Sequence, residues 1–174
     1  MKRKKIVAYL VILVAALCYV EIDTSQFAAE KTAIINVNKD ELFQFLILPD
    51  TVERWFRMVT HFRSADMKSM IPGKRFQVVY PLPMLGNHLM LLRLVKFDPQ
   101  YSQVVLESDC FFKTRVEITA VPFGPHDCSS NLTIKLTFRQ KSALFQWTIA
   151  PVLQYNALQH LNHSITLLNK MVPA

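Results

Sequence analysis

Histidine is the side chain in this sequence best suited to acid–base or metal chemistry, and the chain has five. His160 and His163 stand three residues apart in a C-terminal segment with helical spacing, and side chains so spaced can share a metal ion. No Cys or carboxylate flanks the pair, so the remaining ligands of a site are missing. We therefore interpret both histidines as solvated side chains on a helix and predict no metal site.

Two other histidines stand in settings that invite a catalytic interpretation. His126, Asp127 and Cys128 place a base beside a thiol, but three adjacent residues of a Pro-rich loop rarely converge on one reacting atom. His88 could face the protein interior beside Met90 as an acid–base residue, although no paired carboxylate accompanies it. The chain has no phosphate-binding P-loop, dinucleotide fingerprint or HExxH motif. We therefore predict no cofactor and assign no catalytic residue.

Length and composition limit the class of protein to which the chain can belong. The chain has 174 residues, about one domain by length. Hydrophobic residues make up 51% and charged residues 19%, which excludes a disordered, collagen-like or disulfide-framework protein. The formal net charge is +7, of which residues 1–22 carry +3 and the remaining 152 residues +4. Because no run of Lys or Arg follows residue 5, we predict no nucleic-acid partner.

The N-terminal segment has the layout of a membrane signal. Residues 2–5 are all Lys or Arg, and residues 6–20 contain no charge. A helix that spans a membrane needs about 20 apolar residues, so this run is short. Residues 1–22 are therefore either a signal peptide, cleaved near the small-x-small sequence at residues 16–18, or an uncleaved membrane anchor. Positive residues favour the cytoplasmic side, so we expect an extracytoplasmic domain, membrane-bound or secreted.

The rest of the chain divides into a short polar linker, residues 23–30, and one domain, residues 31–174. The domain opens with an alternating strand pattern at residues 32–37. Asn38 then caps a short helix, which Pro49 ends, and a second short helix follows.

Several strands and one long helix complete the predicted domain. The final helix begins near Pro151, which suits a first helical turn, and carries an apolar stripe as far as residue 172. About twenty helical residues span roughly 30 Å, enough to cross a whole sheet. Apolar segments predict four strands, at residues 58–65, 73–80, 88–97 and 101–108.

The clearest strand pair is a hairpin around a loop at residues 122–130. Pairing Val121 with Asn131 sets Glu117 opposite Lys135 and brings the apolar side chains of both strands to one face.

This hairpin separates the two cysteines of the domain. Cys110 falls beyond its open end and Cys128 in its loop, so about ten strand residues, roughly 30 Å, lie between them. A disulfide needs Cα atoms within about 7 Å. We therefore predict no intramolecular bridge, although an extracytoplasmic compartment would permit one.

Four features of the chain are similar to those of a known family: the element order, the local sequence at residues 35–43, Trp55 after the second short helix and residues 142–145 before the last helix. By these features the chain resembles the START-like (SRPBCC) superfamily of polyketide cyclase and lipid-transfer relatives. The resemblance covers about residues 30–172. It implies an α+β helix-grip fold, in which a curved antiparallel sheet of about seven strands surrounds a long C-terminal helix, with two short helices after strand 1. An N-terminal apolar helix, as expected here, is uncommon in that family.

The resemblance also implies a hydrophobic cavity between the sheet and the last helix. Leu158, Leu161 and Ile165 would form its lid, and the apolar loop residues Pro83, Met84 and Leu85 would form its gate. The alternative for each residue is an ordinary core position or a tucked loop. The residues expected on the inward strand faces are Phe76, Val78, Tyr80, Met90, Leu92, Leu94, Val116, Ile118, Leu136 and Phe138.

The leading functional prediction is a membrane-tethered or secreted module that binds a lipid or another hydrophobic small molecule. One alternative is a cyclase-like or hydrolase-like enzyme on an apolar substrate, for which Tyr80 and His88 would supply polar groups. Another is an interaction scaffold with a filled core. Asn131 begins an Asn-Leu-Thr sequon, which is a glycosylation site if the domain is lumenal in a eukaryote.

Overall fold

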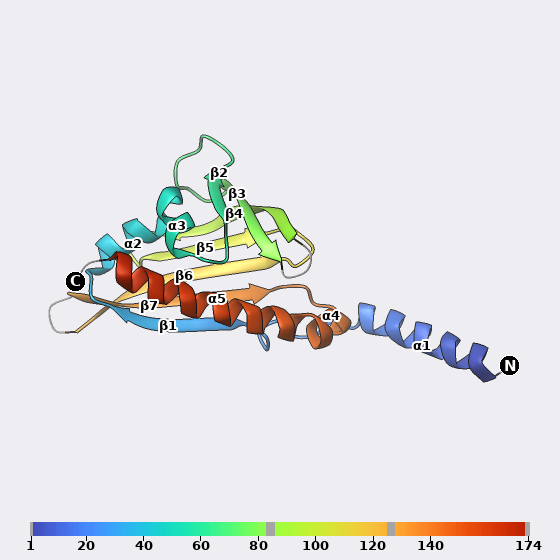
Figure 1. The fold of residues 1–174 in the computed structure, drawn as a ribbon. Helices are drawn as coiled ribbons and strands as arrows, with labels where there is room; N and C mark the ends of the chain where they lie inside the picture. Colours follow the sequence, from blue (N-terminus) through green and yellow to red (C-terminus); the bar gives the residue numbers. More distant parts are fainter. Residues whose placement is uncertain (1, 83–85, 125–127, 173–174) are drawn as a thin grey trace.

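The computed structural model describes residues 2–82, 86–124 and 128–172. Figure 1 shows a curved sheet with helices on one face and a helix, α1 (Lys2–Tyr19), that extends away from the rest. The other helices are α2 (Lys39–Ile47), α3 (Pro49–Trp55), α4 (Ala143–Thr148) and α5 (Ala150–Met171). In their spatial order the strands are β1 (Ala29–Ile35), β7 (Ser129–Phe138), β6 (Thr114–Phe123), β5 (Gln103–Ser108), β4 (Gly86–Asp98), β3 (Arg75–Leu82) and β2 (His61–Ser64).

The predicted fold class is confirmed for the domain. All seven strands pair antiparallel with their neighbours in one sheet. The two short helices follow β1, and α5 is the long final helix. Asn38 caps α2 as predicted, since its side chain accepts a 2.9 Å hydrogen bond from the backbone N–H of Asp40.

The register of the last hairpin also agrees with its prediction. Val121 pairs with Asn131 and Glu117 with Lys135. Both strands continue into the predicted loop, as far as a pair formed by Phe123 and Ser129. Cys110 and Cys128 lie beyond opposite ends of this hairpin, and no disulfide joins cysteines within the described part of the chain.

Several boundaries differ from the sequence-based prediction. β1 begins at Ala29, inside the predicted linker, because its pairing with β7 runs as far as Leu136. Pro49 begins α3 rather than only ending α2, since a first-turn proline loses no helical hydrogen bond. The short helix α4 was not predicted; it begins after Ser142 and ends where α5 begins.

α5 packs its apolar stripe against β1 and β7. α5 also contacts α3. A hydrogen bond of 2.9 Å joins α5 to the segment after α3, in which the backbone N–H of Arg57 donates to Ser164 Oγ. The sheet, α3 and α5 therefore enclose one core, and its largest fully buried side chain is Trp55.

α1 meets the domain beside α4 (Figure 1). The carbonyl of Val20 accepts a 2.8 Å hydrogen bond from the backbone N–H of Ala143, and Glu21 forms an isolated bridge with Ser142. Six consecutive apolar side chains, residues 9–14, are exposed, so α1 is apolar on every side. No helix in the described part of the chain has both the length and the apolar character needed to cross a membrane.

Candidate functional site

Two small apolar hollows lie side by side inside the domain. The first lies between the sheet and the helices α2 and α3, and the second lies toward β3 and β4. Each has a volume of about 30 Å³. One water molecule needs about 10–15 Å³ of such space, so the interior is close to filled.

A thin wall of four side chains separates the two hollows. Phe56, Val59, Leu92 and Val116 line both of them. Leu92 and Val116 belong to strands of the sheet, whereas Phe56 and Val59 belong to the segment that joins α3 to β2. That segment is irregular, so displacement of Phe56 and Val59 would join the hollows without breaking a strand pair.

A third space, which we call the β4 notch, lies at the edge of β4. The last pair between β4 and β5 is Leu92 with Ser108, so residues 86–91 of β4 pair only with β3. The space beside this free edge has a volume of about 610 Å³ and is lined by residues 88–93 and 108–111, together with Arg75.

The β4 notch adjoins the second hollow. Met90 and Leu92 line both the notch and that hollow. Met90 is buried, whereas its neighbours Leu89 and Leu91 point to the outer face and are more than half exposed. The side chains of Met90 and Leu92 therefore separate the surface from the interior at this point.

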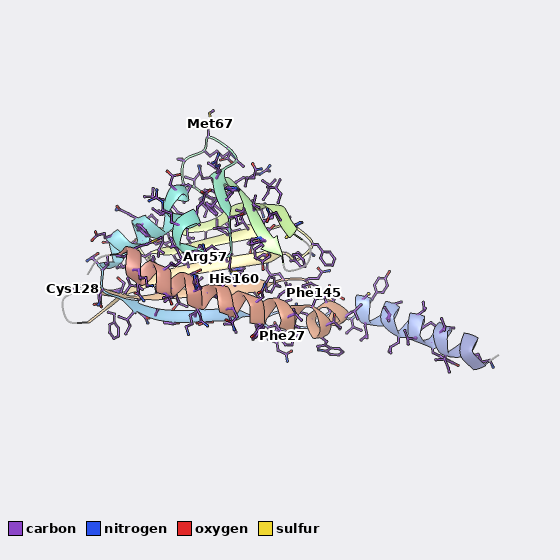
Figure 2. The ribbon with its side chains drawn as sticks, viewed as in Figure 1. Phe27, Arg57, Met67, Cys128, Phe145 and His160 are labelled. Atoms are coloured by element: carbon purple, nitrogen blue, oxygen red, sulfur yellow. The ribbon has the colours of Figure 1, made fainter. Side chains whose placement is uncertain are left out.

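An aromatic cluster places the notch near the base of α1. Phe111, which lines the notch, has its ring centroid 6.0 Å from that of Phe145 in α4. The ring of Phe112 lies between Phe145 and His88, at 6.3 Å from each. Figure 2 labels Phe145 at the end of the domain from which α1 extends.

Three buried polar atoms in this region lack a hydrogen-bond partner of normal geometry: Trp55 Nε1, Tyr80 Oη and Asn156 Nδ2. Trp55 lines the first hollow and Tyr80 the second. Burial raises the pKa of the Tyr80 hydroxyl, and a loose side-chain hydrogen bond with Asn156 opposes part of that rise. An unpaired buried donor costs about 1–3 kcal/mol, so these atoms destabilise the empty interior.

Most of the strand residues predicted to face the interior line one of the hollows. Leu94 is fully buried but lines neither hollow. The nine that do line a hollow are Phe76, Val78, Tyr80, Met90, Leu92, Val116, Ile118, Leu136 and Phe138.

The predicted lid residues do not border either hollow. Leu161 and Ile165 are buried and Leu158 is half-buried, and all three belong to the stripe by which α5 packs on the core. The helical side of the hollows comes from α2, α3 and the segment after α3, which the sequence analysis did not assign to the site. The apolar face that includes Val52, Trp55 and Phe56 was the available signal for it.

The candidate histidines His88 and His160 lie on different elements, β4 and α5. His88 pairs in register with Tyr80 and so shares the inner face, but its ring contacts Phe112 and no carboxylate. His160 is half-buried near Arg57 (Figure 2), and burial, with the charges of Arg57 and His163, lowers its pKa. No three His, Cys, Asp or Glu side chains of the described ranges gather in a metal-binding arrangement.

Two other predicted sites remain, the gate loop and the sequon. The expected gate residues Pro83, Met84 and Leu85 lie outside the described residues. Asn131 of the sequon lies within β7 rather than at a loop junction, half-buried between Ile34 of β1 and Val121 of β6.

Comparison with known proteins supports the fold. No family model matches the chain, and no curated protein sequence matches it. Among solved structures, a START superfamily protein from Mycobacterium smegmatis is similar, with a TM-score of 0.65 and 15% identity over 83% of this chain and 96% of that one. The protein TTHA0849 from Thermus thermophilus has a TM-score of 0.66 and 11% identity over 82% and 94% of the two chains.

A third similar structure is the di-domain ARO/CYC protein BexL from the BE-7585A biosynthetic pathway. Its TM-score is 0.57 and its identity 9%, over 80% of this chain and 46% of that protein. Sequence identities this low support a shared fold and no finer similarity. Together with the seven-stranded antiparallel sheet and the long final helix, they show that residues 29–172 have the START-like fold.

Proposed function

We propose that this protein binds a lipid or another hydrophobic small molecule between the sheet and the α2–α3 segment. The observation that carries the proposal is the pair of adjoining apolar hollows, which are separated by side chains of an irregular segment and reached from the β4 notch past Met90.

Binding requires the wall between the hollows to move, because two spaces of about 30 Å³ cannot hold a lipid chain. The gain comes from apolar burial, at about 0.8 kcal/mol for each methylene group transferred from water. A chain of about twelve carbons therefore gains roughly 10 kcal/mol before the costs of association and of side-chain rearrangement. That gain is large enough to displace Phe56 and Val59 from their positions in the wall.

Native mass spectrometry tests the proposal. Residues 20–174 retain every buried core side chain, because none belongs to α1. This fragment, purified without detergent, is expected to carry a lipid adduct, or to take up one molecule of N-phenyl-1-naphthylamine with a rise in the fluorescence of that probe. A folded fragment that carries no adduct and takes up no probe would instead favour a scaffold with a filled core.

We further propose that α1 attaches the domain to a lipid bilayer, with the domain on the extracytoplasmic side. A helix that is apolar on all sides needs either a protein core or a membrane around it, and α1 has neither in the isolated chain. Large exposed side chains lie on and beside α4 and on the first turns of α5, at the end of the domain where α1 begins. We call this set the collar; it consists of Phe111, Trp147, Ile149, Val152 and Tyr155.

The collar has the composition of a membrane-interface surface. Trp and Tyr concentrate where bilayer and water meet, since one part of each ring system is apolar and the other is polar. Phe111 belongs both to the collar and to the β4 notch. A domain seated on its collar would therefore open the notch toward the bilayer, and a lipid could enter without crossing bulk water.

Flotation with phosphatidylcholine vesicles tests the attachment. The full chain is expected to float with the vesicles and residues 20–174 to bind them weakly. Cleavage of residues 1–22 in the cell, detected by intact mass, would make the protein secreted and would contradict permanent attachment through α1.

A further inference from the structure

We infer that the ligand is an uncharged amphiphile whose carbonyl or hydroxyl oxygen accepts hydrogen bonds from Tyr80 Oη and Asn156 Nδ2. This inference rests on the proposed function and specifies the chemical class of its ligand.

The two donors come from opposite sides of the enclosed core. Tyr80 lies on β3, is 4% exposed and lines the second hollow. Asn156 lies in the second turn of α5, and its amide neighbours the Tyr80 hydroxyl. Neither Tyr80 Oη nor Asn156 Nδ2 completes a hydrogen bond of normal geometry. Buried polar groups in folded proteins nearly always have a partner, so this pair requires an explanation.

The chemistry of these atoms selects an acceptor. The amide nitrogen of Asn156 can only donate, and burial keeps the Tyr80 hydroxyl protonated, so that it has one hydrogen to donate. One oxygen atom with two lone pairs, placed in the second hollow beside Tyr80, would satisfy both donors. Trp55 Nε1 in the first hollow is likewise only a donor, so the unpaired buried atoms of residues that line the hollows each have a hydrogen to offer.

The lining of the hollows excludes a charged head group. Among the described residues, every side chain that lines either hollow is uncharged. A carboxylate or phosphate buried there would lose its hydration without gaining a counter-ion. A ketone, an ester or an alcohol has a much smaller desolvation cost, which two hydrogen bonds offset.

A purely structural role is the competing explanation for the pair. Asn156 Nδ2 can donate to the Tyr80 oxygen, and this contact needs only a small shift to reach normal geometry. If the Asn156 amide were rotated, its oxygen could instead accept from Tyr80. In either arrangement the two side chains would satisfy each other without a ligand. In that case removal of either group would change stability but would not change which ligands are preferred. The test therefore has to measure ligand preference.

The experiment uses the full chain in dodecyl maltoside micelles with Trp147→Phe, which leaves Trp55 as the only tryptophan. The fluorescence of Trp55 reports occupancy of the first hollow during titration with 2-dodecanone, dodecane or dodecanoate. The ketone is expected to bind about tenfold more tightly than the other two probes. Tyr80→Phe is expected to remove this preference while leaving the affinity for dodecane unchanged.

Two further variants complete the design. Asn156→Leu is expected to reduce the preference for the ketone as Tyr80→Phe does. Tyr101→Phe changes an exposed tyrosine outside the hollows, the notch and the collar, and is expected to leave the preference intact. Three results would each overturn the inference while leaving hydrophobic binding in place. They are equal affinities for the ketone and dodecane, a preference for dodecanoate, and a preference for the ketone that survives Tyr80→Phe. If no probe changes the Trp55 signal, the proposed function itself fails.

Discussion

The backbone N–H of Arg57 donates a 2.9 Å hydrogen bond to Ser164 Oγ, and this bond ties the segment after α3 to the C-terminal half of α5. Phe56, the neighbour of Arg57, forms part of the wall between the two hollows. The bond therefore holds one side of that wall against the helix that closes the domain.

Ser164→Ala is expected to destabilise the protein by about 1–2 kcal/mol, because the Arg57 N–H loses its partner in a partly buried position. The midpoint of urea unfolding measures this change. Thr166→Ala on the same helix is the matched control: that hydroxyl bonds to the Asn162 carbonyl on the exposed face, so its loss should stay within about 0.5 kcal/mol. Equal losses of unfolding free energy in the two variants would show that the hydrogen bond between Arg57 and Ser164 contributes no more to stability than the exposed hydroxyl of Thr166 does.

The path past Met90 makes a kinetic prediction. Met90→Trp is expected to slow association of N-phenyl-1-naphthylamine about tenfold, because a larger side chain fills the barrier between the β4 notch and the second hollow. Stopped-flow fluorescence measures the rate.

Val95→Trp is the control for this change, since Val95 lies further along β4, is exposed and does not line the notch. Should Met90→Trp fail to fold, Met90→Ala provides the opposite change and is expected to accelerate association. Rates that are the same in the wild type and both Met90 variants would rule out this route of entry.

Stability should depend on pH through His160. Burial, together with the charges of Arg57 and His163, lowers the pKa of His160 in the folded state below its ordinary value of 6.5. As the pH falls through the pKa of His160 in the unfolded state, the unfolded chain binds a proton that the folded chain does not bind, so unfolding becomes more favourable. Above about pH 7.5 both states are neutral at this residue and the effect vanishes.

His160→Gln is therefore expected to lose less free energy of unfolding than the wild type between about pH 7.5 and pH 5.5. Urea unfolding at a series of pH values gives the two curves. A wild-type curve parallel to that of His160→Gln would show that the environment of His160 does not disfavour its charged form.

The collar makes a prediction for membrane attachment. In residues 20–174, replacing both Trp147 and Tyr155 by Ala should weaken binding to phosphatidylcholine vesicles about tenfold, the equivalent of losing roughly 1.4 kcal/mol of apolar burial. Tyr101→Ala is the control, because Tyr101 is equally exposed but follows β4 at the opposite end from the notch. An equal effect of both changes would mean that the collar is not the membrane-facing surface.

The fold could be predicted from the sequence because its elements repeat simple periodic patterns. Ile118 and Ile134, for example, face each other because alternation places both on the buried face, and that constraint fixed the register of the whole hairpin. The ends of helices and strands could not be predicted as closely, because the first-turn position of Pro49 and the pairing of Ala29 depend on tertiary contacts.

The site could be predicted only on its sheet side. Inward strand residues such as Val78 and Ile118 line the hollows, because alternation determines the face on which they lie. The helical side was assigned to α5, through Leu158, Leu161 and Ile165, but comes from α2, α3 and Phe56. The curvature of a sheet cannot be predicted from the alternation pattern of one sequence, and that curvature determines which helix borders the hollows.

The most direct test of hydrophobic binding is quenching of Trp55 by a brominated alkane, 1-bromodecane, in the Trp147→Phe background. Bromine quenches tryptophan only at contact, and Trp55 is fully buried at the wall of the first hollow. A saturable loss of Trp55 fluorescence in the folded protein is the result predicted if the ligand enters between the sheet and the α2–α3 segment. Fluorescence that stays constant while the fold remains intact would contradict that account.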